Sequence, residues 1–156
     1  MKGWWKVNFD GASKANSVPS GAGVIVRDWK GEVLVLGAQK LEEDTNNLVE
    51  ASATLLAIRM CKLLGLQKLH LEGDSLIIIQ ALMKEGIEAW HLQGWIYNII
   101  EELNFFEDFQ LIHVRCIGNV EAGILSKWAL TFEAVGEFRM EDFQKVIFED
   151  DMGSGN

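Results

Sequence analysis

The chain has 156 residues, of which 49% are hydrophobic, and its formal net charge is −9. This length and composition predict one globular domain with a sizeable core and exclude a largely disordered chain. The acidity argues against a protein that binds nucleic acid tightly and nonspecifically through many phosphates. It does not argue against a site where metal ions supply the positive charge.

Neither a membrane span nor a signal peptide is expected. No apolar run reaches the roughly 18 residues that a span requires, and the N-terminus opens directly into an apolar/polar alternation. The two cysteines, Cys61 and Cys116, fall in an expected helix and an expected strand, where buried, reduced thiols are more typical than disulfides. We therefore expect an intracellular protein, nuclear or cytoplasmic, with no membrane association.

The N-terminal part of the chain predicts three antiparallel strands. Apolar and polar residues alternate over 4–10, which indicates a strand that ends at Asp10. The stretch 11–23, rich in Gly, Ser and Asn, is typical of a loop. A turn in which Gly31 takes a positive φ then joins two further strands. These strands are expected over 22–28 and 32–39.

Helices and strands alternate in the rest of the chain. The first helix is expected to start at a cap formed by Thr45 to Asn47 and to end at Gly65, and Ser75 is expected to cap the second. Strand–helix–strand connections imply parallel pairing. The sequence thus predicts an α/β fold with a five-stranded mixed sheet, three antiparallel strands followed by two parallel ones, flanked by helices. The expected elements are a helix at 45–65, a strand at 68–74, helices at 76–85 and 90–106, a strand at 108–116 and a helix at 119–132.

Residues 133–156 fall outside this plan, so we expect a domain over 1–132 and an acidic C-terminal extension. The extension carries seven Asp and Glu residues against Arg139 and Lys145. Within it, 140–151 has the pattern of one amphipathic helix, and the final residues are typical of a disordered tail.

Three acidic residues occupy unusual positions. Asp10 and Asp74 end two strands that are expected to be parallel neighbours, so both should lie at the same edge of the sheet. Glu50 lies in the first turns of a helix that can pack beside that edge. Taken singly, each acid is explained as a turn residue or a helix-start residue. Their expected convergence favours a site for Mg²⁺ or Mn²⁺, which prefer oxygen ligands.

These residues and their order resemble the ribonuclease H-like domains, most closely the plant reverse-transcriptase-like, retroelement-type group. Asp10 lies in FDGASKAN, Glu50 in TNNLVEASA and Asp74 in EGDSLIIIQAL. The resemblance covers about residues 4–132. It implies hydrolysis of the RNA strand of RNA/DNA hybrids by two metal ions held by these three carboxylates. It also implies substrate contacts from Gly11, Ala12, Ser13, Asn16, Asn46 and Asn47.

The chain departs from the family pattern where the last helix begins. Gly123 stands at the position of the family's fourth catalytic aspartate and has no side chain to bind a metal. Glu121 lies two residues earlier, about 200° round the helix, and should point away. The segment 86–103 carries no Lys or Arg. Its residues Trp90, Trp95 and Tyr97 are more typical of core or partner-facing positions than of base stacking.

Three hypotheses follow from these features. The first is a ribonuclease H that is weakened by the loss of the fourth carboxylate. The second is a catalytically inactive domain that binds nucleic acid, or that binds a protein partner through its tryptophans and acidic extension. The third is a nuclease of the same fold with another substrate.

Overall fold

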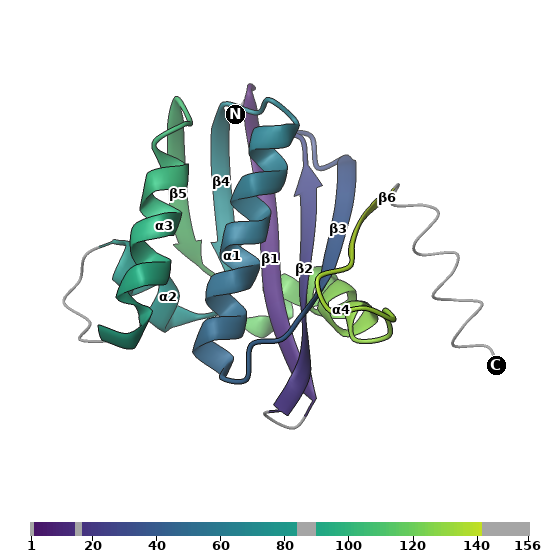
Figure 1. The fold of residues 1–156 in the computed structure, drawn as a ribbon. Helices are drawn as coiled ribbons and strands as arrows, with labels where there is room; N and C mark the ends of the chain where they lie inside the picture. The colour runs from purple at the N-terminus through teal and green to yellow at the C-terminus, as the bar shows by residue number, and fades with distance from the viewer. Residues whose placement is uncertain (1, 15–16, 84–89, 142–156) are drawn as a thin grey trace.

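A six-stranded mixed sheet with the strand order β5-β4-β1-β2-β3-β6 is the centre of the computed structural model, which describes residues 2–14, 17–83 and 90–141 (Figure 1). The central strands β1, β2 and β3 are antiparallel, and β4 and β5 extend the sheet in parallel from β1. The strands are β1 Trp4–Lys14, β2 Ser17–Arg27, β3 Val33–Leu41, β4 Lys68–Gly73, β5 Asp108–His113 and β6 Phe138–Glu141. The expected α/β fold and strand pairing are confirmed, but the expected count of five strands was wrong.

The sixth strand comes from the region that the sequence placed outside the domain. β6 pairs antiparallel with β3, with Phe138 opposite Gln39 and Glu141 opposite Leu36. The edge of a three-stranded meander has unpaired backbone groups, and a short returning segment satisfies them. The helix expected over 140–151 overlaps β6 at its first two residues, and its other residues lie outside the described part.

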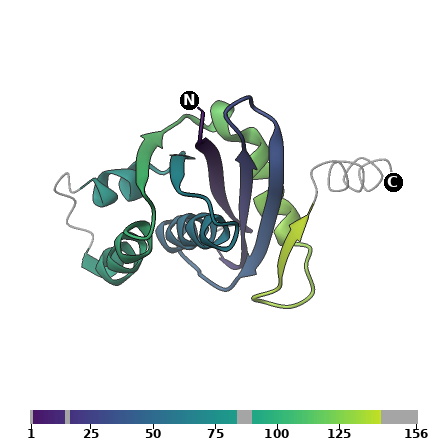
Figure 2. The same ribbon diagram turned by 90° about the horizontal axis from the view of Figure 1, so that it is seen from above.

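Helices cover both faces of the sheet (Figure 2). α1 and α3 lie on one face, and α4 lies on the other. The helices are α1 Asn46–Leu63, α2 Leu76–Leu82, α3 Gln93–Leu103 and α4 Val120–Ala129, with short 3₁₀ turns at Trp90–Leu92 and Cys116–Asn119. No described helix has both the length and the apolar character of a membrane span.

The residues that were predicted to cap helices and to form turns have these roles in the structure. The Thr45 hydroxyl accepts a hydrogen bond from the Leu48 N–H at the start of α1, and Gly65 takes φ +70° after its end. Ser75 caps α2, and Gly31 takes φ +91° in the turn between β2 and β3. The local sequence therefore determines where these elements begin and end.

The first hairpin differs from expectation, because the predicted loop 11–23 is mostly strand. β1 continues past Asp10 to Lys14, and β2 begins at Ser17. Gly11 pairs with Ala22, and Ser13 pairs with Ser20. Glycines weaken a strand locally, but pairing along the whole hairpin outweighs this tendency. Asp10 therefore lies within a paired strand rather than at its end.

Alternation along β1 separates the two faces of the sheet. Val7 and Phe9 are buried in the core beneath α1. The alternate residues Asn8 and Asp10 face α4. α4 packs so closely on β2 that a Cβ atom at Gly23 would collide with the main chain of α4. This close approach brings the start of α4 beside Asp10.

Candidate active site

Three carboxylates meet where β1, β4 and α1 come together. Asp10 lies in β1, Asp74 follows the last residue of β4, and Glu50 lies in the second turn of α1. One oxygen from each carboxylate lies within 4.8 Å of the other two. The structure thus brings together the three acids that the sequence predicted to converge.

Backbone pairing and one glycine set this geometry. Phe9 is opposite Gly73 in the parallel β1–β4 pair, so Asp10 and Asp74 are next to each other in register. A Cβ atom at Gly11 would lie 2.5 Å from the Val49 side chain, so only glycine allows α1 to approach β1 this closely. The Gly11 N–H donates to Asp10 Oδ1 at 2.9 Å and to Glu50 Oε1 at 3.3 Å.

Two of these carboxyl groups hold their protons unusually strongly. Burial, followed by the negative charge of Asp74, raises the pKa of Asp10 from 3.8 to about 7. Burial, followed by the charges of Asp10 and Asp74, raises the pKa of Glu50 from 4.5 to about 9. Carboxylates placed together without a cation repel one another in this way, and each retained proton reduces the repulsion.

The site has the properties of a cation-binding site. Glu50 Oε2 is buried and has no hydrogen-bond partner among the described residues. A buried carboxylate oxygen without a partner is costly unless a cation or a proton neutralises it. Among the described residues, the cluster consists of three carboxylates without a nitrogen or sulfur atom, a set that suits Mg²⁺ or Mn²⁺. The residues present therefore fit the implied metal.

The residues expected to contact substrate are placed unevenly around this cluster. A cavity of about 400 Å³ in front of the carboxylates is lined by Gly11, Ser13, Asn46 and Asn47. The Ser13 hydroxyl donates to Asn46 Oδ1 at 3.3 Å. Ala12 pairs with Gly21 in the hairpin and does not line the cavity, and Asn16 lies outside the described residues. Because Thr45 is the helix cap, the Asn46 and Asn47 amides are not needed for that task.

Position 123 lies directly against the carboxylate cluster. A Cβ atom built on Gly123 would be 3.1 Å from Asp10 Oδ2. A longer side chain here would therefore reach the carboxylate cluster, whereas the glycine adds no side-chain group to it. Glu121 does not replace it, because its carboxylate forms an ion pair with Arg27 at the end of β2. The sequence-based expectation that Glu121 points away agrees with this contact.

The sequence did not predict a buried polar network beneath the carboxylates. Asn8 Nδ2 donates to Glu72 Oε1 at 3.0 Å and to Asn119 Oδ1 at 3.1 Å. Asn119 Nδ2 donates to the Phe9 carbonyl at 2.8 Å, and His70 lies 2.8 Å from Glu72 Oε2. These bonds join β1 and β4 to the turn before α4. The signal was available: Asn8 alternates in step with Asp10, and polar residues on one face of a buried strand need partners.

Two side chains differ from their expected surroundings. Cys61 is buried as expected, but Cys116 is exposed and lines the acidic cavity, because β5 ends at His113 and the chain has already left the sheet. Trp95 packs partly against the core, as expected, whereas Tyr97 is exposed on α3. His113 Nε2 lies 3.2 Å from the Asp74 carbonyl oxygen, which ties β5 to the turn that carries the third carboxylate.

Comparison with known proteins identifies the family. The sequence profile of the family described as reverse transcriptase-like matches residues 8–129, which include all three carboxylates and position 123. The chain belongs to this family of ribonuclease H-like domains. The sequence motifs around Asp10, Glu50 and Asp74 had indicated the same kind of domain.

Ribonucleases H are also among the most similar single proteins. Ribonuclease HI of Halobacterium salinarum is 29% identical over 127 residues, which cover 78% of this chain and 62% of that protein. A ribonuclease H of Cyanothece sp. is 34% identical over 90 residues, 58% of this chain and 53% of that protein. The chain thus spans less than two thirds of the length of these curated relatives.

Solved structures show the same fold. The crystal structure of RNase H1 from Halobacterium salinarum superposes with a TM-score of 0.78 at 26% identity, and covers 81% of this chain and 97% of that one. LC11-RNase H1 in complex with an RNA/DNA hybrid gives a TM-score of 0.75 at 21% identity, and covers 81% and 96%. The mixed sheet flanked by helices is therefore the arrangement found in ribonucleases H.

Proposed function

We propose that this domain hydrolyses the RNA strand of RNA/DNA hybrids with divalent cations, Mg²⁺ or Mn²⁺, held by Asp10, Glu50 and Asp74. The observation that carries the proposal is the convergence of three carboxylates within 4.8 Å in a ribonuclease H-like domain. The relatives named above are ribonucleases H, and one related structure holds an RNA/DNA hybrid. That ligand is the substrate class that we assign to this chain.

Each residue has a definable task in this reaction. Bound divalent cations supply Lewis-acid activation of a water and stabilise the leaving oxygen of a phosphodiester. Asp10 and Asp74 act as ligands, and Glu50 acts both as a ligand and as the group that orients the attacking water. Gly11, Ser13, Asn46 and Asn47, with Ala12 and Asn16 nearby in sequence, would contact the hybrid, since amides and hydroxyls can pair with the ribose 2′-OH. With glycine at position 123 we expect weakened metal binding and low activity.

The decisive experiment is cleavage of a labelled RNA/DNA hybrid in Mg²⁺ and in Mn²⁺. Asp10→Asn keeps the shape of the side chain but removes a charged ligand, so it should abolish cleavage. Glu101→Gln is the matched control, because Glu101 is an exposed acid on α3. Cleavage that survives Asp10→Asn would show that the activity does not come from this site.

A second candidate function is a catalytically inactive domain that binds nucleic acid or a protein partner. The absence of a side chain at Gly123 and the net charge of −9 favour it. It predicts that the wild-type chain does not cleave the hybrid in either metal. No cleavage by Gly123→Asp as well would show that the missing fourth carboxylate is not the only defect. Binding of the hybrid without cleavage would support this alternative.

We further assign the chain to the plant, retroelement-derived group of the family and to a nuclear or cytoplasmic location. The motifs FDGASKAN and TNNLVEASA support the group assignment. Expression of a tagged chain in plant cells, followed by imaging, tests the location.

A further inference from the structure

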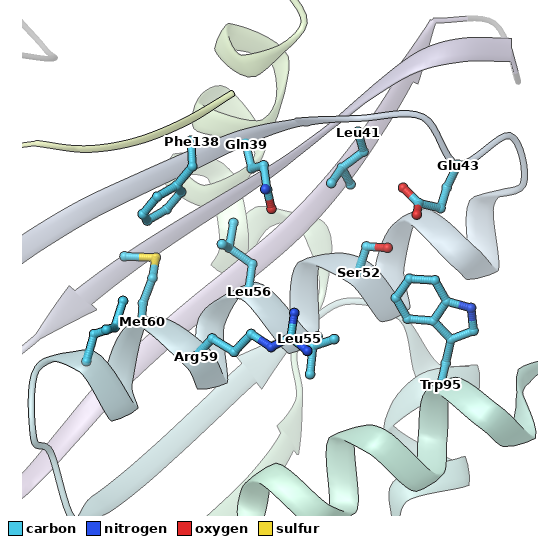
Figure 3. A pocket seen from close by; sticks show the side chains of 11 residues that line it. Gln39, Leu41, Glu43, Ser52, Leu55, Leu56, Arg59, Met60, Trp95 and Phe138 are labelled. Atoms are coloured by element: carbon cyan, nitrogen blue, oxygen red, sulfur yellow. The ribbon is translucent and has the colours of Figure 1, made fainter. Parts of the chain in front are cut away.

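A second pocket, away from the carboxylate cluster, lies between α1 and the strands β3 and β6, with α3 at one end (Figure 3). Its volume is about 400 Å³. The walls are largely apolar and include Leu41, Leu55, Leu56 and Met60. A pocket with apolar walls and a few polar groups is the usual form of a ligand site.

Two polar atoms in this pocket lack partners. The Ser52 hydroxyl lies on a side chain that is only 7% exposed, and Glu43 Oε2 is also buried. Neither atom has a hydrogen-bond partner among the described residues. The backbone of Glu43 is held in place, because the Ser20 hydroxyl donates to its carbonyl oxygen at 2.9 Å. Buried polar atoms are normally paired, so this pair of orphaned atoms needs an explanation.

The polar groups gather at one end of the pocket. Figure 3 shows the Glu43 carboxylate, the Ser52 hydroxyl and the Trp95 ring grouped at the end nearest α3. A carboxylate only accepts hydrogen bonds, a hydroxyl can accept them, and the face of an indole ring attracts cations. All three groups therefore favour a positively charged N–H donor. The net charge of −9 further raises the local concentration of cations.

The other charged residue in the pocket does not change this conclusion. Arg59 also lines it, but Arg59 Nε lies 3.9 Å from Glu102 Oε1 and its side chain is 59% exposed. The Arg59 side chain extends along the pocket toward Ser52 and Trp95 (Figure 3), but its charge is balanced by an acid on α3 and exposed to solvent. The apolar walls lie beside the acceptor end, so a matching ligand carries its cation on an aliphatic stem.

We propose that this pocket binds a lysine side chain of a partner protein, with the ammonium group at Glu43, Ser52 and Trp95 and the methylene groups along the leucine-rich wall. Long cationic side chains commonly place their stems on apolar surface while the charged head meets polar groups. The proposal does not depend on the proposed nuclease activity, because none of its residues belongs to the carboxylate cluster.

Nuclear magnetic resonance of the full ¹⁵N-labelled chain tests the proposal with two matched probes. N-acetyl-lysine methylamide carries the charged side chain, and N-acetyl-norleucine methylamide carries a similar stem without the charge. The lysine probe should give saturable shifts of the Ser52 amide and the Trp95 indole N–H, and the norleucine probe should bind more weakly. Equal binding of the two probes, or no saturable shift with the lysine probe, would overturn the proposal.

Substitutions test whether the Glu43 carboxylate binds the ammonium group of the lysine probe. Glu43→Gln should weaken binding of the lysine probe by about tenfold or more, because a hydrogen bond to a charged group is lost. Ser52→Ala should weaken it severalfold. Glu42→Gln, which neutralises the neighbouring exposed acid, is the control and should leave binding unchanged. If Glu43→Gln and Glu42→Gln behave alike, the ammonium does not bind at this end of the pocket.

Discussion

Restoring a carboxylate at position 123 should strengthen metal binding. The Cβ atom that any side chain adds at Gly123 lies 3.1 Å from Asp10 Oδ2, so the carboxylate of Gly123→Asp would lie about 4 Å from that of Asp10. Two like charges at this distance repel by roughly 4 kcal/mol at an effective dielectric constant of about 20. A divalent cation between them removes the repulsion and is attracted to both.

The net gain is smaller than this Coulomb energy, because both groups are partly hydrated and the cation loses bound water. We expect Mn²⁺ to bind Gly123→Asp more tightly by about 1.5–3 kcal/mol, a ten- to hundredfold lower dissociation constant. Isothermal titration calorimetry measures this constant, and the hybrid cleavage assay should show a parallel increase. In the absence of metal, the same variant should be less stable than the wild type.

Gly123→Asn is the matched control, since it has the shape of aspartate without the charge. Gly123→Ala separately tests the 3.1 Å steric contact. If Asn strengthens Mn²⁺ binding as much as Asp does, the effect is not electrostatic. If Asp leaves binding unchanged, position 123 is not next to the metal ions and the reasoning is refuted.

The remaining predictions concern pH and packing. The pKa of Glu50 rises from 4.5 to about 9 on folding, so the metal-free folded state holds more protons than the unfolded state across that window and its stability should fall as pH rises from about 5 to 9. Thermal melts in a chelator check the sign, Glu50→Gln should flatten the slope, and a melting temperature that rises over this window would contradict it. Gly23→Ala should destabilise by about 1–3 kcal/mol, because its Cβ meets the α4 main chain, whereas Gly94→Ala, at an exposed helix position with open space, should be neutral or slightly stabilising; urea titrations compare the two. Asn119→Ala should cost about 1–3 kcal/mol, because the Asn8 amide and the Phe9 carbonyl lose a buried partner, and an unchanged urea midpoint would show that the network contributes little.

Local signals in the sequence predicted the elements and the acids well. Thr45 and Ser75 cap helices where expected, and Gly31 and Gly65 take the positive φ that ends a strand or a helix. These features depend on interactions between residues only a few positions apart, so the local sequence is enough to predict them. The same holds for Glu121, whose direction follows from helix geometry alone.

Features that depend on distant partners were missed. The stretch 11–23 has the composition of a loop, but it is a strand because the two arms of the hairpin pair with each other. Cys116 was expected in a buried strand, but β5 ends three residues earlier and leaves it exposed. β6 was missed because a four-residue edge strand has little pattern of its own and forms only when it meets β3.

The sequence by itself determined the family, the α/β fold and the identity of the three carboxylates, because a motif needs only residue type and order. The tertiary structure decided how those carboxylates act on one another. The close contact of Gly11 with α1 sets their separation, and burial raises the pKa values of Asp10 and Glu50. It also decided that position 123 lies against Asp10 and that Trp95 joins Glu43 and Ser52 in one pocket, since such distances arise only when strands and helices far apart in the chain pack together.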